Sequence, residues 1–174
     1  TVFGQACLFT TEPDHFIKLW RTWKRYLVNA NLWSTSAVLG FPRIGPQREV
    51  KKALEAYWGD KISAEELLKV AKEQRLNTYA TIKEQGVDFV PTGTFSLYDH
   101  VLDMSNTLGI IPEAYAKSGL SQLDTYFAMA RGHQKGGVDL PATEMKKWFD
   151  SNYHYLVPEF SEKSEFKLND NKPV

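Results

Sequence analysis

Hydrophobic residues recur at helical spacing along much of the chain. In residues 49–58 they share one face, and a glycine follows the last of them. A second helix is predicted from residue 63 to Gln85, because Ser63 and Glu66 form a capping box whose side chains satisfy free N–H groups. Further helices are predicted over residues 96–108, 122–130 and 140–149.

Three short apolar runs alternate with these helices and are predicted as strands. They are residues 37–40, 87–90 and 153–157. Each run stops at a proline, which lacks the N–H group that a central strand needs. The strand–helix–strand order predicts parallel strands in an α/β layer. Connections that carry two or more helices indicate a decorated barrel or sheet. Since a whole (β/α)₈ barrel takes roughly 250 residues, we expect a partial TIM-type barrel.

Residues 1–35 differ in character from the rest of the chain. Aromatic and leucine side chains fall on one face of a predicted helix here, and lysines and arginines fall on the other. Such a helix lies on a membrane, carries a targeting signal or docks on a partner in many proteins. It also fits a helix packed on its own domain, or a non-native leader. We therefore separate an amphipathic leader, residues 1–35, from the incomplete barrel, residues 36–174.

Composition narrows the class of protein. The 174 residues include 21 Lys and Arg and 21 Asp and Glu, so the net charge of zero predicts neither nucleic acid nor a membrane as partner. The single cysteine, Cys7, has no partner for an internal disulfide, and the four histidines show no metal-binding spacing. No apolar run approaches the roughly 20 residues that span a bilayer. We expect a globular protein of the cytoplasm.

The clearest candidate chemistry lies in residues 40–52. This segment leaves a predicted strand and opens a helix, and it carries four cations: Arg43, Arg48, Lys51 and Lys52. Helix N-termini favour anions, because free N–H groups and the helix dipole point toward them. The cluster therefore predicts a site for a carboxylate or a phosphate. The alternatives are that the basic side chains simply reach into water, or that Glu49 pairs with one of them.

A second candidate segment is residues 144–155. Its aromatic residues interleave with four polar ones: Lys147, Asp150, Asn152 and His154. Flat aromatic faces with a few amide and charged groups suit a heteroaromatic ligand. The alternative is that Trp148, Phe149 and Tyr155 belong to the core and that Asn152 caps a turn.

A third segment, residues 94–103, follows the second predicted strand. Asp99 stands beside His100, but neighbours on a helix point about 100° apart and do not form an acid–base pair by themselves. We predict instead that Ser96 or Thr94 caps the helix that starts here.

These segments together resemble the family of cobalamin-independent methionine synthase, the 5-methyltetrahydropteroyltriglutamate–homocysteine methyltransferase. The resemblance starts near Ser36 and runs to the end of the chain, and residues 1–35 match nothing in the family. It is carried above all by LGFPRIGPQREVKKALEAYW at 39–58 and WFDSNYHYLVPEF at 148–160. Both runs are long and unusual, so the resemblance is specific.

The resemblance implies a fold and a role for the chain. The family has two (β/α)₈ barrels, and this chain would cover the first strands and long βα insertions of the N-terminal one. That barrel helps to hold the polyglutamate tail of the folate. The motif matches imply that six residues contact the folate: Arg48, Glu49, Val50, Lys51, Lys147 and Asn152.

The resemblance also implies what the chain lacks. The family needs no cobalamin; its catalytic zinc and its homocysteine pocket lie in the C-terminal barrel, so we expect neither zinc ligands nor catalytic residues here. In the complete enzyme zinc would hold homocysteine as a thiolate, which attacks the methyl group of 5-methyltetrahydropteroyltriglutamate. The chain is thus interpreted as the folate-binding part of a methyltransferase, inactive by itself. A second hypothesis is a non-catalytic module, derived from such a barrel, that binds anions or a partner.

Overall fold

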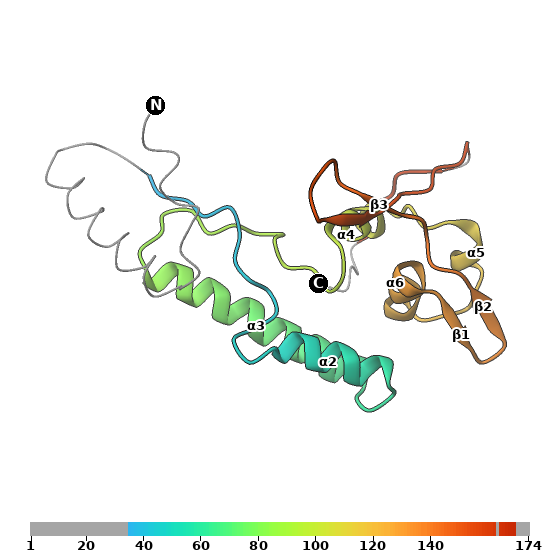
Figure 1. The fold of residues 1–174 in the computed structure, drawn as a ribbon, viewed down its shortest axis with the longest axis horizontal. Helices are drawn as coiled ribbons and strands as arrows, with labels where there is room; N and C mark the ends of the chain where they lie inside the picture. Colours follow the sequence, from blue (N-terminus) through green and yellow to red (C-terminus); the bar gives the residue numbers. More distant parts are fainter. Residues whose placement is uncertain (1–34, 163, 170–174) are drawn as a thin grey trace, which may run out of the picture. The chain divides into compact units, whose positions relative to one another are not determined.

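The computed structural model describes residues 35–162 and 164–169, so the predicted leader, residues 1–35, lies outside them except for its last residue. The described residues fall into two units. One contains residues 35–41 and 76–92, and the other contains residues 42–75 together with the described residues from 93 onward. Figure 1 shows the labelled helices and strands. No helix in the described residues is long and apolar enough to cross a membrane.

The first unit joins two of the predicted strands. Ala37 and Phe89 form a single parallel bridge, so the predicted direction is correct but the runs form no longer ladder. The bridge is flanked by side-chain bonds, because the amide and hydroxyl of Ser36 both donate to the Asp88 carboxylate at 2.7 Å. The Asp88 amide donates back to the Ser36 hydroxyl at 3.1 Å.

Two predicted helices are confirmed closely. Helix α2 spans Glu49–Trp58 and buries Val50, Ala53 and Leu54. Helix α3 spans Ala64–Glu84 and starts at the predicted capping box. The Ser63 amide donates to the Glu66 carboxylate at 2.8 Å, and the Glu66 amide donates to the Ser63 hydroxyl at 3.2 Å.

Helix α4 starts later than predicted. It spans His100–Thr107, and its cap is Asp99 rather than Ser96 or Thr94. The Ser96 hydroxyl instead accepts from the Tyr98 amide at 3.2 Å, in a local turn that competes with a helix. The predicted helical spacing is correct only from Asp99 onward.

Helix α6 spans Gln122–Arg131, as predicted to within one residue, and Ser121 caps it. A one-turn helix that the sequence did not predict, α5, spans Glu113–Ala116. After α6 the chain forms a hairpin of β1 (His133–Lys135) and β2 (Val138–Leu140). Its turn is the glycine pair Gly136 and Gly137, both at positive φ, as a two-residue hairpin turn requires.

The predicted helix over 140–149 is wrong. Residues of that stretch lie in β2 and in β3 (Met145–Lys147), which pairs antiparallel with β4 (His154–Leu156). The predicted parallel direction of the strand at 153–157 is therefore also wrong. The reason is connection length, because the six residues between β3 and β4 allow a hairpin but not a crossover. Mixed helices and short strands remain compatible with an α/β fragment.

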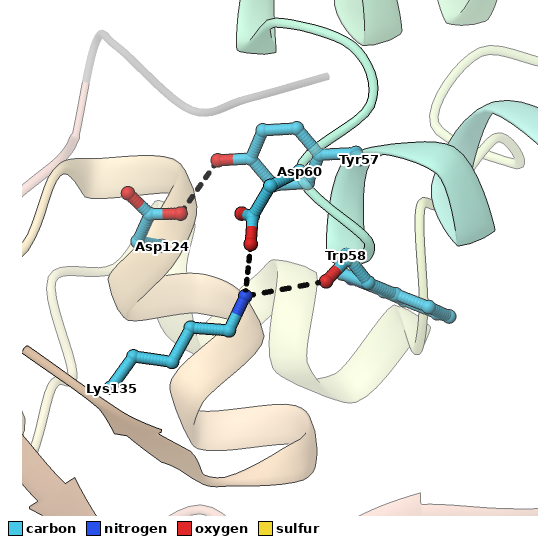
Figure 2. Close-up of polar contacts among 5 residues, drawn as sticks. All are labelled: Tyr57, Trp58, Asp60, Asp124 and Lys135. Carbon is cyan, nitrogen blue, oxygen red and sulfur yellow. Dashed lines mark hydrogen bonds and ion pairs between the residues drawn. The ribbon is translucent and has the colours of Figure 1, made fainter.

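The second unit has one hydrophobic core. Helices α2, α4 and α6, the first half of α3 and strand β4 contribute to it, and α4 packs on both α6 and β4. Its largest fully buried side chains are Tyr126, Leu67, Leu97, Leu102 and Val50. Polar contacts fasten the end of α2 to α6 and to the first hairpin (Figure 2): the Tyr57 hydroxyl donates to Asp124 at 2.6 Å, and the Lys135 ammonium lies 2.6 Å from the Asp60 carboxylate.

Candidate functional site

The turn before α2 is held by its own backbone. The Arg48 amide donates to the Gly45 carbonyl at 3.1 Å, and the Val50 amide donates to the Ile44 carbonyl at 3.0 Å. Arg48 is the N-cap of α2 and lies in the left-handed region, with φ 62° and ψ 37°. A residue with a side chain pays about 1–3 kcal/mol for that conformation, and such strain gathers at binding sites.

Glu49, the acidic residue of this turn, already accepts a hydrogen bond within the turn. The Glu49 carboxylate accepts from the Gln47 amide at 3.0 Å, and no described cation forms an ion pair with it. A Cβ atom at Gly45, where φ is +88°, would overlap this carboxylate. Glu49 therefore shapes the turn, and the alternative that it neutralises the basic cluster is not what the structure shows. Val50 is fully buried, so any part it has in binding is structural.

The four cations of the cluster divide into two kinds. Arg43 is committed to the protein, because its guanidinium donates to the Ser96 carbonyl at 2.9 Å and to the Tyr98 carbonyl at 3.1 Å. Lys51 lies 3.7 Å from Glu55 in a pair exposed to solvent, which contributes little to stability. Arg48 and Lys52 are exposed and have no ion pair within the described residues. Three cations of the cluster thus remain available to an anion.

The other predicted contacts lie on the β3–β4 hairpin. Lys147 is the last residue of β3 and pairs in register with His154, and Asn152 lies in the connecting turn. The Trp148 amide donates to the Tyr153 carbonyl at 2.7 Å and closes that turn. Lys147 and Asn152 are therefore at the same end of the hairpin. Both are exposed.

Lys147 differs from its neighbour on the same strand. Lys146 lies 3.3 Å from Glu144, whereas Lys147 has no ion pair within the described residues. Successive residues of a strand point to opposite faces, so the two lysines present their charges on different sides of the hairpin. Lys146, which has an ion pair, is therefore a control for substitutions of Lys147, which has none within the described residues.

The alternative prediction, that the aromatic residues of the hairpin belong to the hydrophobic core, is wrong for the two most exposed of them. Trp148 is 49% exposed and Phe149 is 82% exposed, with their rings edge to face at 5.2 Å. Phe149 also has a positive φ of 47°. Tyr155 is half-buried and packs edge to face on Trp148 at 5.5 Å. An exposed aromatic pair therefore borders Lys147.

The structure adds a residue that sequence reasoning did not assign to a site. Asp99 is 4% exposed, and its carboxylate accepts from the Leu102 amide at 3.0 Å, the Leu156 amide at 3.3 Å and the Tyr153 hydroxyl. The signal in the sequence was an aspartate directly before an apolar helical pattern, which is typical of an N-cap. As expected, its carboxylate bonds elsewhere than to its neighbour His100.

A buried tyrosine extends this polar network. Tyr126 donates its hydroxyl hydrogen to Asp103 at 2.6 Å, and its hydroxyl oxygen accepts from the Tyr98 amide at 3.1 Å. Burial, followed by the charge of Asp103, raises the pKa of Tyr126 above its ordinary value. Burial and the hydrogen bond to Asp99 likewise raise the pKa of Tyr153. Both hydroxyls therefore keep their protons at neutral pH.

The predicted contacts thus form two groups. Arg48, Glu49, Val50 and Lys51 are consecutive at the start of α2, and Lys147 and Asn152 share the tip of the hairpin. No hydrogen bond or ion pair among the described residues joins the groups directly. They are connected through residues 96–99, which accept hydrogen bonds both from Arg43 and from the hairpin.

Comparison with known proteins decides the family. Residues 35–174 match the family described as "Cobalamin-independent synthase, N-terminal domain". The chain belongs to this family. Its resemblance to cobalamin-independent methionine synthase is thereby confirmed over the segment that carried it.

Named relatives of this family come from fungi and bacteria. The chain is 59% identical over 145 residues to the "Probable 5-methyltetrahydropteroyltriglutamate--homocysteine methyltransferase" of Schizosaccharomyces pombe, and this covers 80% of the chain and 19% of that protein. The 5-methyltetrahydropteroyltriglutamate–homocysteine methyltransferase of Saccharomyces cerevisiae is 54% identical over 145 residues, with the same shares covered. That of Flavobacterium johnsoniae is 56% identical over 133 residues, covering 75% of the chain and 17% of the protein. The chain spans about a fifth of these relatives.

Proposed function

We propose that the chain binds the polyglutamate tail of 5-methyltetrahydropteroyltriglutamate, the methyl donor that the relatives' names specify. Arg48 and Lys51 would contact glutamate carboxylates, Lys147 would add a third positive charge, and Asn152 would donate a hydrogen bond. The observation that carries the proposal is the basic start of α2, where Arg48 and Lys52 have no ion pair within the described residues and Lys51 has only an exposed one. A chain of carboxylates is the ligand that such a surface favours.

The strained backbone of Arg48 supports the same assignment. The left-handed conformation places a charged side chain at the N-cap, where glycine or asparagine would be less strained. Its guanidinium makes no contact with a described acid. A binding role explains why an arginine occupies this position at a cost in stability.

The complete reaction is proposed for a longer protein of the relatives' kind. There the methyl group would pass from the folate to homocysteine to give methionine, without cobalamin, and zinc would activate the homocysteine thiol. The described residues contain no group of three or more His, Cys, Asp or Glu that could hold a metal, so no step is assigned to zinc in this chain. The chain would form the opening part of an N-terminal barrel, act in the cytoplasm and bring the methyl donor but not the nucleophile.

Titration of the chain with the triglutamyl and monoglutamyl forms of 5-methyltetrahydrofolate tests the proposal. We expect the triglutamyl form to bind more tightly, and its affinity to fall with ionic strength because the contacts are charged. Lys51→Glu should weaken the triglutamyl form about tenfold and the monoglutamyl form much less. Lys72→Glu, an exposed lysine on α3, is the matched control.

The hairpin lysines allow a sharper version of this test. Lys147→Glu should weaken binding of the triglutamyl form by a factor of about five to ten, whereas Lys146→Glu, which disrupts an exposed ion pair, should leave the affinity unchanged. Equal effects of the two substitutions would contradict the assignment of Lys147. A wild-type chain that does not distinguish the two ligands would contradict the proposed function as a whole.

A non-catalytic module that binds other anions is the second candidate. The observation in its favour is that Arg48 and Lys52 have no described ion-pair partner, so any polyanion of suitable spacing meets the same charges. Competition separates the two candidates. Free tri-γ-glutamate should displace the folate under the first, and inorganic triphosphate should displace it equally well only under the second.

A further inference from the structure

We propose that Asp99 is a positioning residue for the polyglutamate site. Its carboxylate anchors the β3–β4 hairpin and thereby fixes where the hairpin presents Lys147 and Asn152. This inference rests on the proposed function and assigns to the same site a residue that does not touch the ligand.

The anchor consists of a single carboxylate that joins a helix and a strand. One oxygen of Asp99 accepts from the Leu102 amide in the first turn of α4 and from the Leu156 amide in β4, at 3.0 and 3.3 Å. The other oxygen accepts from the Tyr153 hydroxyl, next to β4. A buried carboxylate with several donors is held firmly, because leaving any donor unpaired in a buried site is costly.

The same short stretch also holds the approach to α2. Arg43 donates to the carbonyls of Ser96 and Tyr98, directly before Asp99. The loop of residues 96–99 therefore contacts both the segment that leads to Arg48 and the hairpin that carries Lys147. Movement of this loop would change the separation of the two groups of cations, and that separation must match the spacing of glutamate carboxylates on the ligand.

Tyr153 connects Asp99 to the end of the hairpin that carries the proposed ligand contacts. It directly follows Asn152, and its carbonyl accepts from the Trp148 amide at 2.7 Å, beside Lys147. Loss of the bond from Tyr153 to Asp99 would free this end of the hairpin while the Leu102 and Leu156 amides keep their acceptor. The predicted consequence is a mobile tip on an otherwise folded chain.

Two substitutions test the anchor. Tyr153→Phe removes only the hydroxyl and should weaken binding of the triglutamyl folate about fivefold, with amide exchange in residues 145–156 about tenfold faster. Asp99→Asn should remain close to wild type in both measurements. Its amide oxygen can still accept from both backbone N–H groups, and its NH₂ group can donate to the Tyr153 oxygen.

The chain offers a matched control for loss of a tyrosine–aspartate bond. Tyr57→Phe removes the hydrogen bond to Asp124 between α2 and α6 (Figure 2), which is of the same kind but lies away from the hairpin. We expect a comparable loss of thermal stability but unchanged exchange in the hairpin and unchanged affinity. Tyr155→Phe, two residues further along in β4, controls for the loss of a hydroxyl that makes no described hydrogen bond.

The outcomes separate this inference from the proposed function. Unchanged hairpin exchange in Tyr153→Phe, or equal losses of affinity in Tyr153→Phe and Tyr57→Phe, would overturn the positioning role and leave the proposed function standing. A wild-type chain without affinity for the triglutamyl folate would overturn both. Faster hairpin exchange together with a loss of affinity confined to the triglutamyl form supports the inference.

Discussion

The turn before α2 and the β3–β4 hairpin both carry proposed ligand contacts, but they are held in place in different ways. The turn is fixed by backbone bonds between residues at most six apart, such as Val50 to Ile44. The hairpin is anchored to Asp99 by bonds that span 54 and 57 residues. One half of the site therefore depends on its local sequence, and the other half depends on a distant side chain.

This difference predicts how each half responds to change. Substitutions elsewhere in the chain should leave the backbone bonds of the turn intact, because those bonds close within the segment; only the approach to the turn is tied to a distant loop, through Arg43. The hairpin should respond to substitutions more than fifty residues away. Stability and affinity measured on the same variants test this contrast.

The largest effect is expected at Asp99. Asp99→Ala leaves three donors without an acceptor and removes the cap of α4, so the free energy of unfolding should fall by about 3–4 kcal/mol. Asp99→Asn should lose less than about 1.5 kcal/mol. Urea unfolding followed by tryptophan fluorescence measures both. Similar losses in the two variants would mean that charge, rather than hydrogen bonding, makes Asp99 important.

The next largest effect is expected in the turn itself. Gly45→Ala introduces a side chain at a φ of +88° and into the space of the Glu49 carboxylate, so it should destabilise by about 1–3 kcal/mol. If the turn is a local unit, amide exchange should rise around residues 44–50 and stay unchanged in the hairpin. Faster exchange in both segments would contradict the contrast. Gly136→Ala, at a glycine with open space around it, controls for the positive φ alone.

The same contrast explains what could be predicted from the sequence. The bounds of α2 and the capping box of α3 were correct, because the interactions that set them lie within a few residues. The helix predicted over 140–149 was wrong, because distant partners decide its backbone. The amide and hydroxyl of Thr143 both donate to the Met129 carbonyl at 2.9 Å, and the Val157 amide donates to the Glu144 carbonyl at 2.8 Å.

The candidate site divides in the same way. That the start of α2 is basic follows from the sequence alone, but that Arg43 is committed to two carbonyls does not, because its partners lie more than fifty residues away. The role of Asp99 in holding the hairpin could not be predicted either, because its partners Tyr153 and Leu156 lie equally far along the chain. The hairpin of β1 and β2 is a different case, since the Gly136–Gly137 pair is a local turn signal although no hairpin was predicted there.

A smaller effect is expected from alkaline pH, to which Tyr57 in α2 contributes as well as the tyrosines near the hairpin, because burial also raises its pKa. Burial raises the pKa of Tyr153 and Tyr126 in the folded chain, whereas in the unfolded chain their pKa lies near 10. Their contribution to stability is therefore complete below about pH 10 and is lost as pH rises through the folded values, because the unfolded state releases its protons first. Urea unfolding measured between about pH 8 and pH 11, a range around the unfolded pKa of roughly 10, should show this fall in the free energy of unfolding. Tyr153→Phe should lose less, and a decline that begins well below pH 9 would point to other groups.

The smallest effect on stability, and the most informative one, is expected at Arg48. Arg48→Gly relieves the left-handed strain but adds backbone freedom to the unfolded chain, so a net gain of about 0.5–1 kcal/mol in the free energy of unfolding is expected. Because the guanidinium is lost, the same variant should bind the triglutamyl folate about tenfold more weakly. Asp60→Gly relieves a similar positive φ of 56° away from the proposed contacts, so its affinity should stay at the wild-type value. A gain in stability with unchanged affinity in Arg48→Gly would mean that the strain at the start of α2 serves no ligand, and the turn would then be left with Lys51 alone.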